Sequence, residues 1–92
     1  MKASVLHNFC TPPILEEVND PVCGLNSVVI ELKACGVCRS DHHAWSGNDP
    51  DVKLPHIMGH ELAGVIVETG PEIEKFSIGD HVTVPFILGC GL

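Results

Sequence analysis

The chain has 92 residues, of which 45% are hydrophobic, and twelve acidic against five basic side chains give a formal net charge of −7. This length allows one small domain, and the hydrophobic share argues against a disordered chain. The acidic balance argues against nucleic acid as a partner, because phosphate binding relies on Lys and Arg, and equally against an anionic membrane surface.

The N-terminus carries one lysine and no long apolar stretch, and no segment reaches the ~18 apolar residues that a membrane-spanning helix needs. We therefore expect a cytoplasmic protein without a signal peptide. Because cytoplasmic cysteines stay reduced, the five cysteines favour thiolate chemistry or metal binding over a disulfide framework.

Short strands dominate the elements that the sequence predicts. Pro12-Pro13 ends the first of them. The third alternates, with Ile30, Leu32 and Ala34 on one face, and the fourth is apolar on both faces, as in a buried strand. In chain order the predicted strands are 2–6, 14–18, 27–34, 61–69 and 81–84.

Residues 39–45 lack strand character and are short enough for a two-turn helix that ends before Gly47. The sequence contains no internal repeat, low-complexity tract or linker. The pattern therefore predicts a mainly β fold, built as a small, partly open β-barrel or sandwich with little helix.

The segment from Val82 to Leu92 is the most apolar run of the sequence, and the chain stops there. Natural termini are usually polar and exposed. We therefore expect the chain to be the front part of a longer protein.

A polar cluster, ACGVCRSDHH at positions 34–43, follows the third predicted strand. Its C-x-x-C spacing, Cys35 and Cys38, permits a redox dithiol, in which a helix N-terminus activates the first thiol, although that motif belongs to a βαβ pattern. A covalent haem is excluded because position 39 is Arg rather than His.

Two further interpretations need no catalysis. A structural zinc site requires four ligands in two close pairs. The sequence has no second cysteine pair, so histidines such as His56 and His60 would have to supply the other two ligands. Alternatively, Cys35 is a buried small hydrophobe and His42 lies on a solvated helix surface.

An open catalytic zinc site takes three protein ligands from separated parts of the chain. Cys38 and His60 stand 22 positions apart, and Gly59 lets the backbone bend close to a metal. A thiolate and an imidazole favour zinc over magnesium or calcium. Asp41 is suited to accept the other ring proton of a histidine ligand.

The residues after Cys38 add further chemistry. Ser40 and His43 stand at i and i+3 on the predicted helix, so a hydroxyl and an imidazole share one face, as a proton relay requires. Arg39 is the single arginine of the sequence and could grip a phosphate.

On these residues the sequence resembles the N-terminal, GroES-like part of zinc-dependent alcohol dehydrogenases, which belong to the medium-chain dehydrogenase/reductase superfamily. The resemblance covers essentially the whole chain and rests on ACGVCRSDHHAW, on GHExxGxxxxxG from Gly59 to Gly70, and on the turn at Gly79-Asp80. It implies a GroES-like, partly open β-barrel with one or two short helices over residues 1–92.

The resemblance also implies roles for the metal-site residues. Cys38 and His60 would be catalytic zinc ligands, Glu61 an alternative ligand, and Asp41 the residue that orients His60. Cys90 would be the first ligand of a structural zinc site, with the remaining ligands beyond the sequence.

For the proton and the cofactor, Ser40 would receive the alcohol proton and His43 would pass it on through the cofactor ribose. Arg39 would meet the cofactor pyrophosphate. The sequence holds no G-x-G-x-x-G fingerprint, so the cofactor-binding Rossmann domain is absent from it.

The implied function is oxidation of an alcohol to an aldehyde or ketone by hydride transfer to NAD(P), in a full-length enzyme that is a homodimer or homotetramer. The 92 residues alone would be inactive. A stand-alone GroES-like binding module and a dithiol oxidoreductase stay open as alternatives. The sequence does not select the alcohol, or NAD over NADP.

Overall fold

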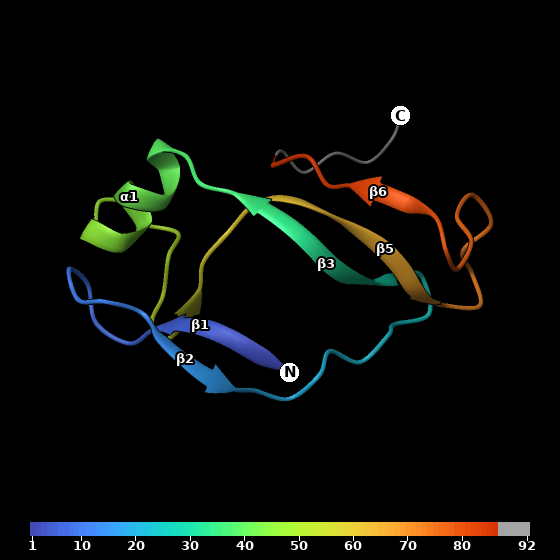
Figure 1. Ribbon diagram of the computed structural model, residues 1–92, viewed down its shortest axis with the longest axis horizontal. Helices are drawn as coiled ribbons and strands as arrows, with labels where there is room; N and C mark the ends of the chain where they lie inside the picture. Colours follow the sequence, from blue (N-terminus) through green and yellow to red (C-terminus); the bar gives the residue numbers. More distant parts are fainter. Residues whose placement is uncertain (87–92) are drawn as a thin grey trace. The chain divides into compact units, whose positions relative to one another are not determined.

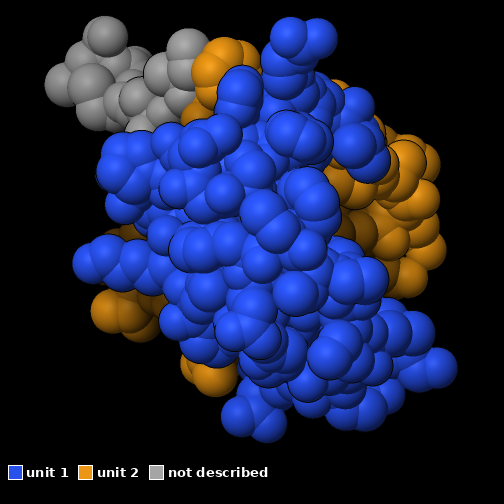
Figure 2. Space-filling model, turned by 90° about the vertical axis from the view of Figure 1, so that its left-hand side faces the viewer, with its two compact units in different colours: residues 1–20, 37–59 blue, residues 21–36, 60–92 orange. Residues whose placement is uncertain are grey.

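The computed structural model describes residues 1–86 of the chain. It consists mainly of strands, with one short helix (Figure 1), which confirms the predicted mainly β class. The chain divides into two compact units, coloured separately in Figure 2: unit 1 comprises residues 1–20 and 37–59, and unit 2 comprises residues 21–36 and the chain from 60 onward. Cys90 lies outside the described residues.

Unit 1 contains an open three-stranded antiparallel sheet in the order β2-β1-β4. The central strand pairs on both sides, Val5 with Ile14 and with Ile57. Its side chains Ala3, Val5 and Leu6 are buried. The elements of unit 1 are β1 (Lys2–Leu6), β2 (Ile14–Glu17), α1 (Arg39–Ser46) and β4 (His56–Ile57).

Unit 2 contains a second open antiparallel sheet, in the order β3-β5-β6. The ladder between β3 and β5 runs from the pair Val28–Thr69 to the pair Gly36–Glu61. The elements of unit 2 are β3 (Val28–Gly36), β5 (Glu61–Thr69) and β6 (His81–Thr83). Within the described residues, no helix is long and apolar enough to cross a membrane.

The predicted elements are found, with small changes at their ends. β1 and β5 have the predicted bounds, β2 and β6 are one residue shorter, and α1 is one residue longer. The strand β4 was missed because a pairing of two residues is too short to leave a periodic pattern.

The predicted alternation along β3 is wrong in its second half. Two irregularities interrupt the ladder, between Val29 and Ile30 and between Leu32 and Ala34. An extra residue in one strand shifts the following side chains to the other face. The extra residue of β3 is Lys33, so Ala34 leaves the face that Ile30 and Leu32 share. Leu32 precedes this irregularity and is 56% exposed on the edge strand of the sheet.

The fourth predicted strand is also less buried than expected. Along β5 only Gly64 and Ile66 are fully buried, and Val67 is 43% exposed. The apolar run therefore formed the expected strand, but only part of it is core.

Gly64 of β5 lies against the backbone of β3. A Cβ atom at this position would overlap the carbonyl oxygen of Glu31 and would lie 2.7 Å from Cγ2 of Ile30. The close approach of the two strands therefore requires glycine here.

We expect Gly64→Ala to destabilise the chain by about 1–3 kcal/mol, because a backbone carbonyl cannot move aside without distorting the ladder. Urea denaturation followed by circular dichroism measures the loss. Gly24→Ala is the matched control, since its Cβ would meet only the Ser27 side chain, with the hydroxyl oxygen at 3.1 Å. Equal effects of the two substitutions would contradict this account.

Candidate metal centre

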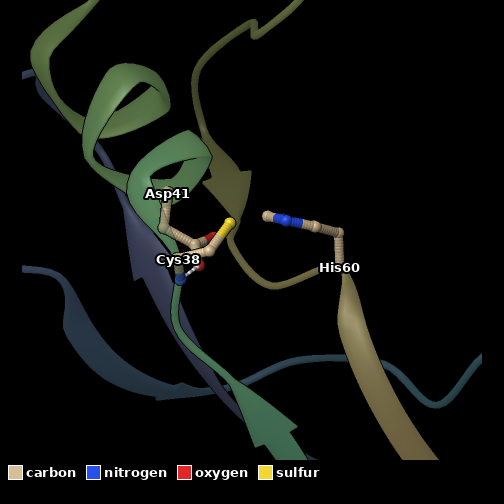
Figure 3. A group of neighbouring side chains, drawn as sticks. All are labelled: Cys38, Asp41 and His60. Carbon is tan, nitrogen blue, oxygen red and sulfur yellow. Dashed lines mark hydrogen bonds between the residues drawn. The ribbon is translucent and has the colours of Figure 1, made fainter. Parts of the chain in front are cut away.

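Cys38 lies immediately before α1 and is its N-cap residue. The Cys38 backbone N–H donates a hydrogen bond to Oδ2 of Asp41 at 3.1 Å, marked by the dashed line in Figure 3. Asp41 is only 7% exposed. The sequence Cys-Arg-Ser-Asp thus has the spacing of a capping box with Cys in the place of Ser or Thr. This contact is not among the sequence-based predictions, although the Cys-x-x-Asp spacing is its signal in the sequence.

His60 directly precedes β5, and its side chain is 30% exposed. Gly59, the residue before it, has φ of 113°, a backbone conformation that residues other than glycine rarely adopt. The Nε2 atom of His60 lies 4.0 Å from Oε1 of Glu61. A Cβ atom at Gly36 would overlap the other carboxylate oxygen of Glu61, so the glycine leaves room for that carboxylate.

The pairing of β3 with β5 relates the two sequence-predicted donors. Gly36 and Glu61 form the last pair of the ladder. Cys38 follows Gly36 by two residues, and His60 precedes Glu61 by one. Both donors are therefore attached to the same end of the ladder by very short lengths of chain.

The donor set suits zinc. Cys38, Asp41 and His60, drawn in Figure 3, offer a sulfur, a carboxylate oxygen and an imidazole nitrogen. Sulfur and imidazole are the donors that zinc takes most often in proteins. The N-terminus of α1 also favours negative charge at its cap, as a thiolate ligand requires.

The helix presents its other predicted residues at the surface of unit 1. Ser40 and His43 are exposed and line one open hollow together with the loop that follows α1, which confirms that they share a face. Arg39 is exposed beside a second hollow, which Cys38 and His43 also line. His43 thus borders both hollows.

The structure gives no support to the redox dithiol. That chemistry would need the first thiol of the pair at a helix N-terminus. Here the second cysteine, Cys38, caps α1, whereas Cys35 lies within β3. The prediction that Cys35 is buried is also wrong, because β3 is an edge strand whose last six residues are all exposed.

Comparisons with known proteins show the family to which the chain belongs. The family model described as "Alcohol dehydrogenase GroES-like domain" matches residues 24–92. The chain belongs to this family. Among curated members, an alcohol dehydrogenase of Geobacillus stearothermophilus is 43% identical over 99% of the chain. The chain spans only 28% of the length of that enzyme.

Solved structures of the family have the same fold. The zinc-dependent alcohol dehydrogenase 2 from Streptococcus pneumonia, in its apo form, superposes with a TM-score of 0.89 and 26% identity over all of this chain and 26% of its own. The structure of CAD from Helicobacter pylori complexed with NADP(H) gives a TM-score of 0.85 and 31% identity over 97% of this chain and 26% of its own. The GroES-like fold expected from the resemblance is thereby confirmed.

Proposed function

We propose that residues 1–92 are the GroES-like N-terminal part of the catalytic domain of a zinc-dependent alcohol dehydrogenase that uses NAD(P). The observation that supports this proposal most is that Cys38 and His60 both lie within two residues of the Gly36–Glu61 pair, the last pair of the β3–β5 ladder. The names of the relatives supply the reaction class. The chain spans about a quarter of those relatives, so the activity is that of a longer protein.

In this proposal Cys38 and His60 are two zinc ligands, and the third is Glu61 or a residue outside the chain. Asp41 orients the imidazole of His60 in this proposal, and one of its carboxylate oxygens accepts the hydrogen bond from the Cys38 backbone N–H. A zinc ion bound here supplies Lewis acidity toward the alcohol oxygen. Cys90 is the first ligand of a separate structural zinc site.

The helix α1 supplies the proton path. The Ser40 hydroxyl would accept the proton that the alcohol loses, and the imidazole of His43 would pass it toward solvent; a bound cofactor would supply its ribose hydroxyls to this path. The exposure of both side chains supports this path, because protons on them exchange with water. The guanidinium of Arg39 binds the cofactor pyrophosphate. The complete protein is a cytoplasmic homodimer or homotetramer.

A chimera tests the proposal directly. Residues 1–92 replace the matching segment of the Geobacillus stearothermophilus enzyme, which then supplies the rest of its own chain. We expect alcohol-dependent reduction of NAD or NADP that is lost on dialysis against a chelator and restored by zinc. The isolated chain should show none. A folded chimera without this activity would contradict the proposal and favour a non-catalytic binding module.

A further inference from the structure

The helix α1 is held at its C-terminal end by a loop from the start of the chain. It has only eight residues, and a helix this short is marginal unless other contacts support it. Its own C-terminal turn is closed by backbone N–H groups of Gly47 and Asn48, which donate to the carbonyls of Ala44 and His43 at 3.4 and 3.0 Å. The carbonyl of Trp45 accepts its hydrogen bond from outside the helix.

Trp45 makes two hydrogen bonds to the loop formed by Phe9, Cys10 and Thr11, which we call the Phe9–Thr11 loop. The Cys10 N–H donates to the Trp45 carbonyl at 2.9 Å. The Trp45 indole N–H donates to the Thr11 carbonyl at 2.7 Å, across 34 positions of sequence. All of these residues belong to unit 1.

The Phe9–Thr11 loop is shaped to receive these bonds. Cys10 has φ of 59°, in the left-handed region that non-glycine residues seldom occupy, and such a conformation persists only where its surroundings fix it. The Thr11 hydroxyl donates to the Asn8 carbonyl at 2.8 Å. The ring of Phe9 lies so close to Gly47 that a Cβ there would come within 3.2 Å of it.

The candidate zinc ligand Cys38 is the N-cap residue of the same helix. Asp41 and Ala44 are buried, and Asp41 holds the Cys38 N–H. Because α1 has only about two turns, a displacement of its C-terminal turn also displaces the N-terminal turn next to Cys38.

We propose that Trp45 is a positioning residue of the metal site, which fixes the Cys38 sulfur by anchoring α1 to the Phe9–Thr11 loop. The inference rests on the proposed function for the metal itself. In this inference Trp45 contacts neither the metal nor the substrate.

The test uses Trp45→Phe, which keeps an aromatic ring and removes only the indole N–H. Ser46→Ala is the matched control, because it deletes a hydrogen bond within the same helix, from the Ser46 hydroxyl to the His43 carbonyl, and none to the loop. Cobalt(II) is the probe, since its ligand-field bands report the arrangement of the bound sulfur.

We expect Trp45→Phe to weaken cobalt binding roughly three- to tenfold, the effect of one hydrogen bond, and to shift the ligand-field bands. Ser46→Ala should change neither. A loss of stability alone would lower the amount of folded protein without moving the bands of the bound metal. Unshifted bands and unchanged affinity in Trp45→Phe would overturn the inference.

Amide hydrogen exchange at Cys38 separates this inference from the proposed function. Without any metal, Trp45→Phe should speed exchange of that amide relative to Ser46→Ala, and equal rates would refute the positioning role. If the unsubstituted chain failed to bind cobalt through Cys38, the metal proposal would fall while the exchange result still stood. If Trp45→Phe does not fold, Phe9→Ala removes the ring that lies beside Gly47, at the C-terminal end of α1, without changing the sequence of α1, and the same readouts apply.

Discussion

A chain carrying Cys38→Ser should lose zinc and cobalt binding by more than about 100-fold, beyond the range seen when residues around metal ligands are replaced. The thiolate is the strongest donor of the set, and a hydroxyl does not replace it at neutral pH. Serine is a preferred N-cap residue, so α1 should stay formed in this variant. The loss of metal binding would then result from the missing thiolate donor and not from unfolding of the helix.

Cys35→Ser is the matched control, since it removes the other thiol of the same C-x-x-C. Cobalt titration should give a thiolate-to-cobalt charge-transfer band in the unsubstituted chain and in Cys35→Ser, but none in Cys38→Ser. His60→Gln should weaken binding in the same direction while keeping the band. Loss of the band in Cys35→Ser instead would overturn the assignment of the donor.

In the chimera, Ser40→Ala should lower kcat by about 10²-fold or more, the usual contribution of a positioned proton-transfer group. Alanine favours helix, so α1 is not weakened by the change. The KM for the alcohol should change little, because the hydroxyl acts as the proton leaves and not in apolar contact with the substrate.

Ser46→Ala provides the comparison here too, because it removes the other serine hydroxyl of α1, at the far end of the helix. It should leave kcat within about twofold of the parent chimera. Stopped-flow measurement of hydride transfer gives the rate of the chemical step. Equal rates in the two variants would remove Ser40 from the proton path.

The sequence predicted those elements whose signal is local. The run from Glu61 to Thr69 is long and apolar, and β5 has these bounds. The helix was predicted because residues 39–45 lack strand character and Gly47 follows, and Gly47 indeed adopts the left-handed C-cap conformation with φ of 84°. Both signals lie within ten residues of the structure that they specify.

The irregularities of β3 could not be predicted in this way. A strand with an extra residue retains its β-branched composition, so the sequence still placed Ala34 on the same face as Ile30 and Leu32. The exposure of Cys35 could not be predicted either, because nothing in the sequence near it indicates that β3 lies at the edge of its sheet.

The sequence predicted which residues form the candidate site better than it predicted the contacts that hold them. Cys38 and His60 were selected by their chemistry and spacing, and the Gly36–Glu61 pair relates them. The cap from Asp41 had a local signal. The anchoring of Trp45 to the Phe9–Thr11 loop had none, because it joins segments more than thirty positions apart through one indole N–H and one unusual backbone conformation.

The Gly36–Glu61 pair also sets where the chain tolerates a change of length. His60 is the residue immediately before Glu61, and only Val37 lies between Gly36 and Cys38. An insertion in either segment would move a donor and, before Cys38, would displace the start of α1 as well. The exposed residues 74–76, in the loop between β5 and β6, carry no donor of the candidate metal site, so we expect an insertion or a grafted peptide to be tolerated there.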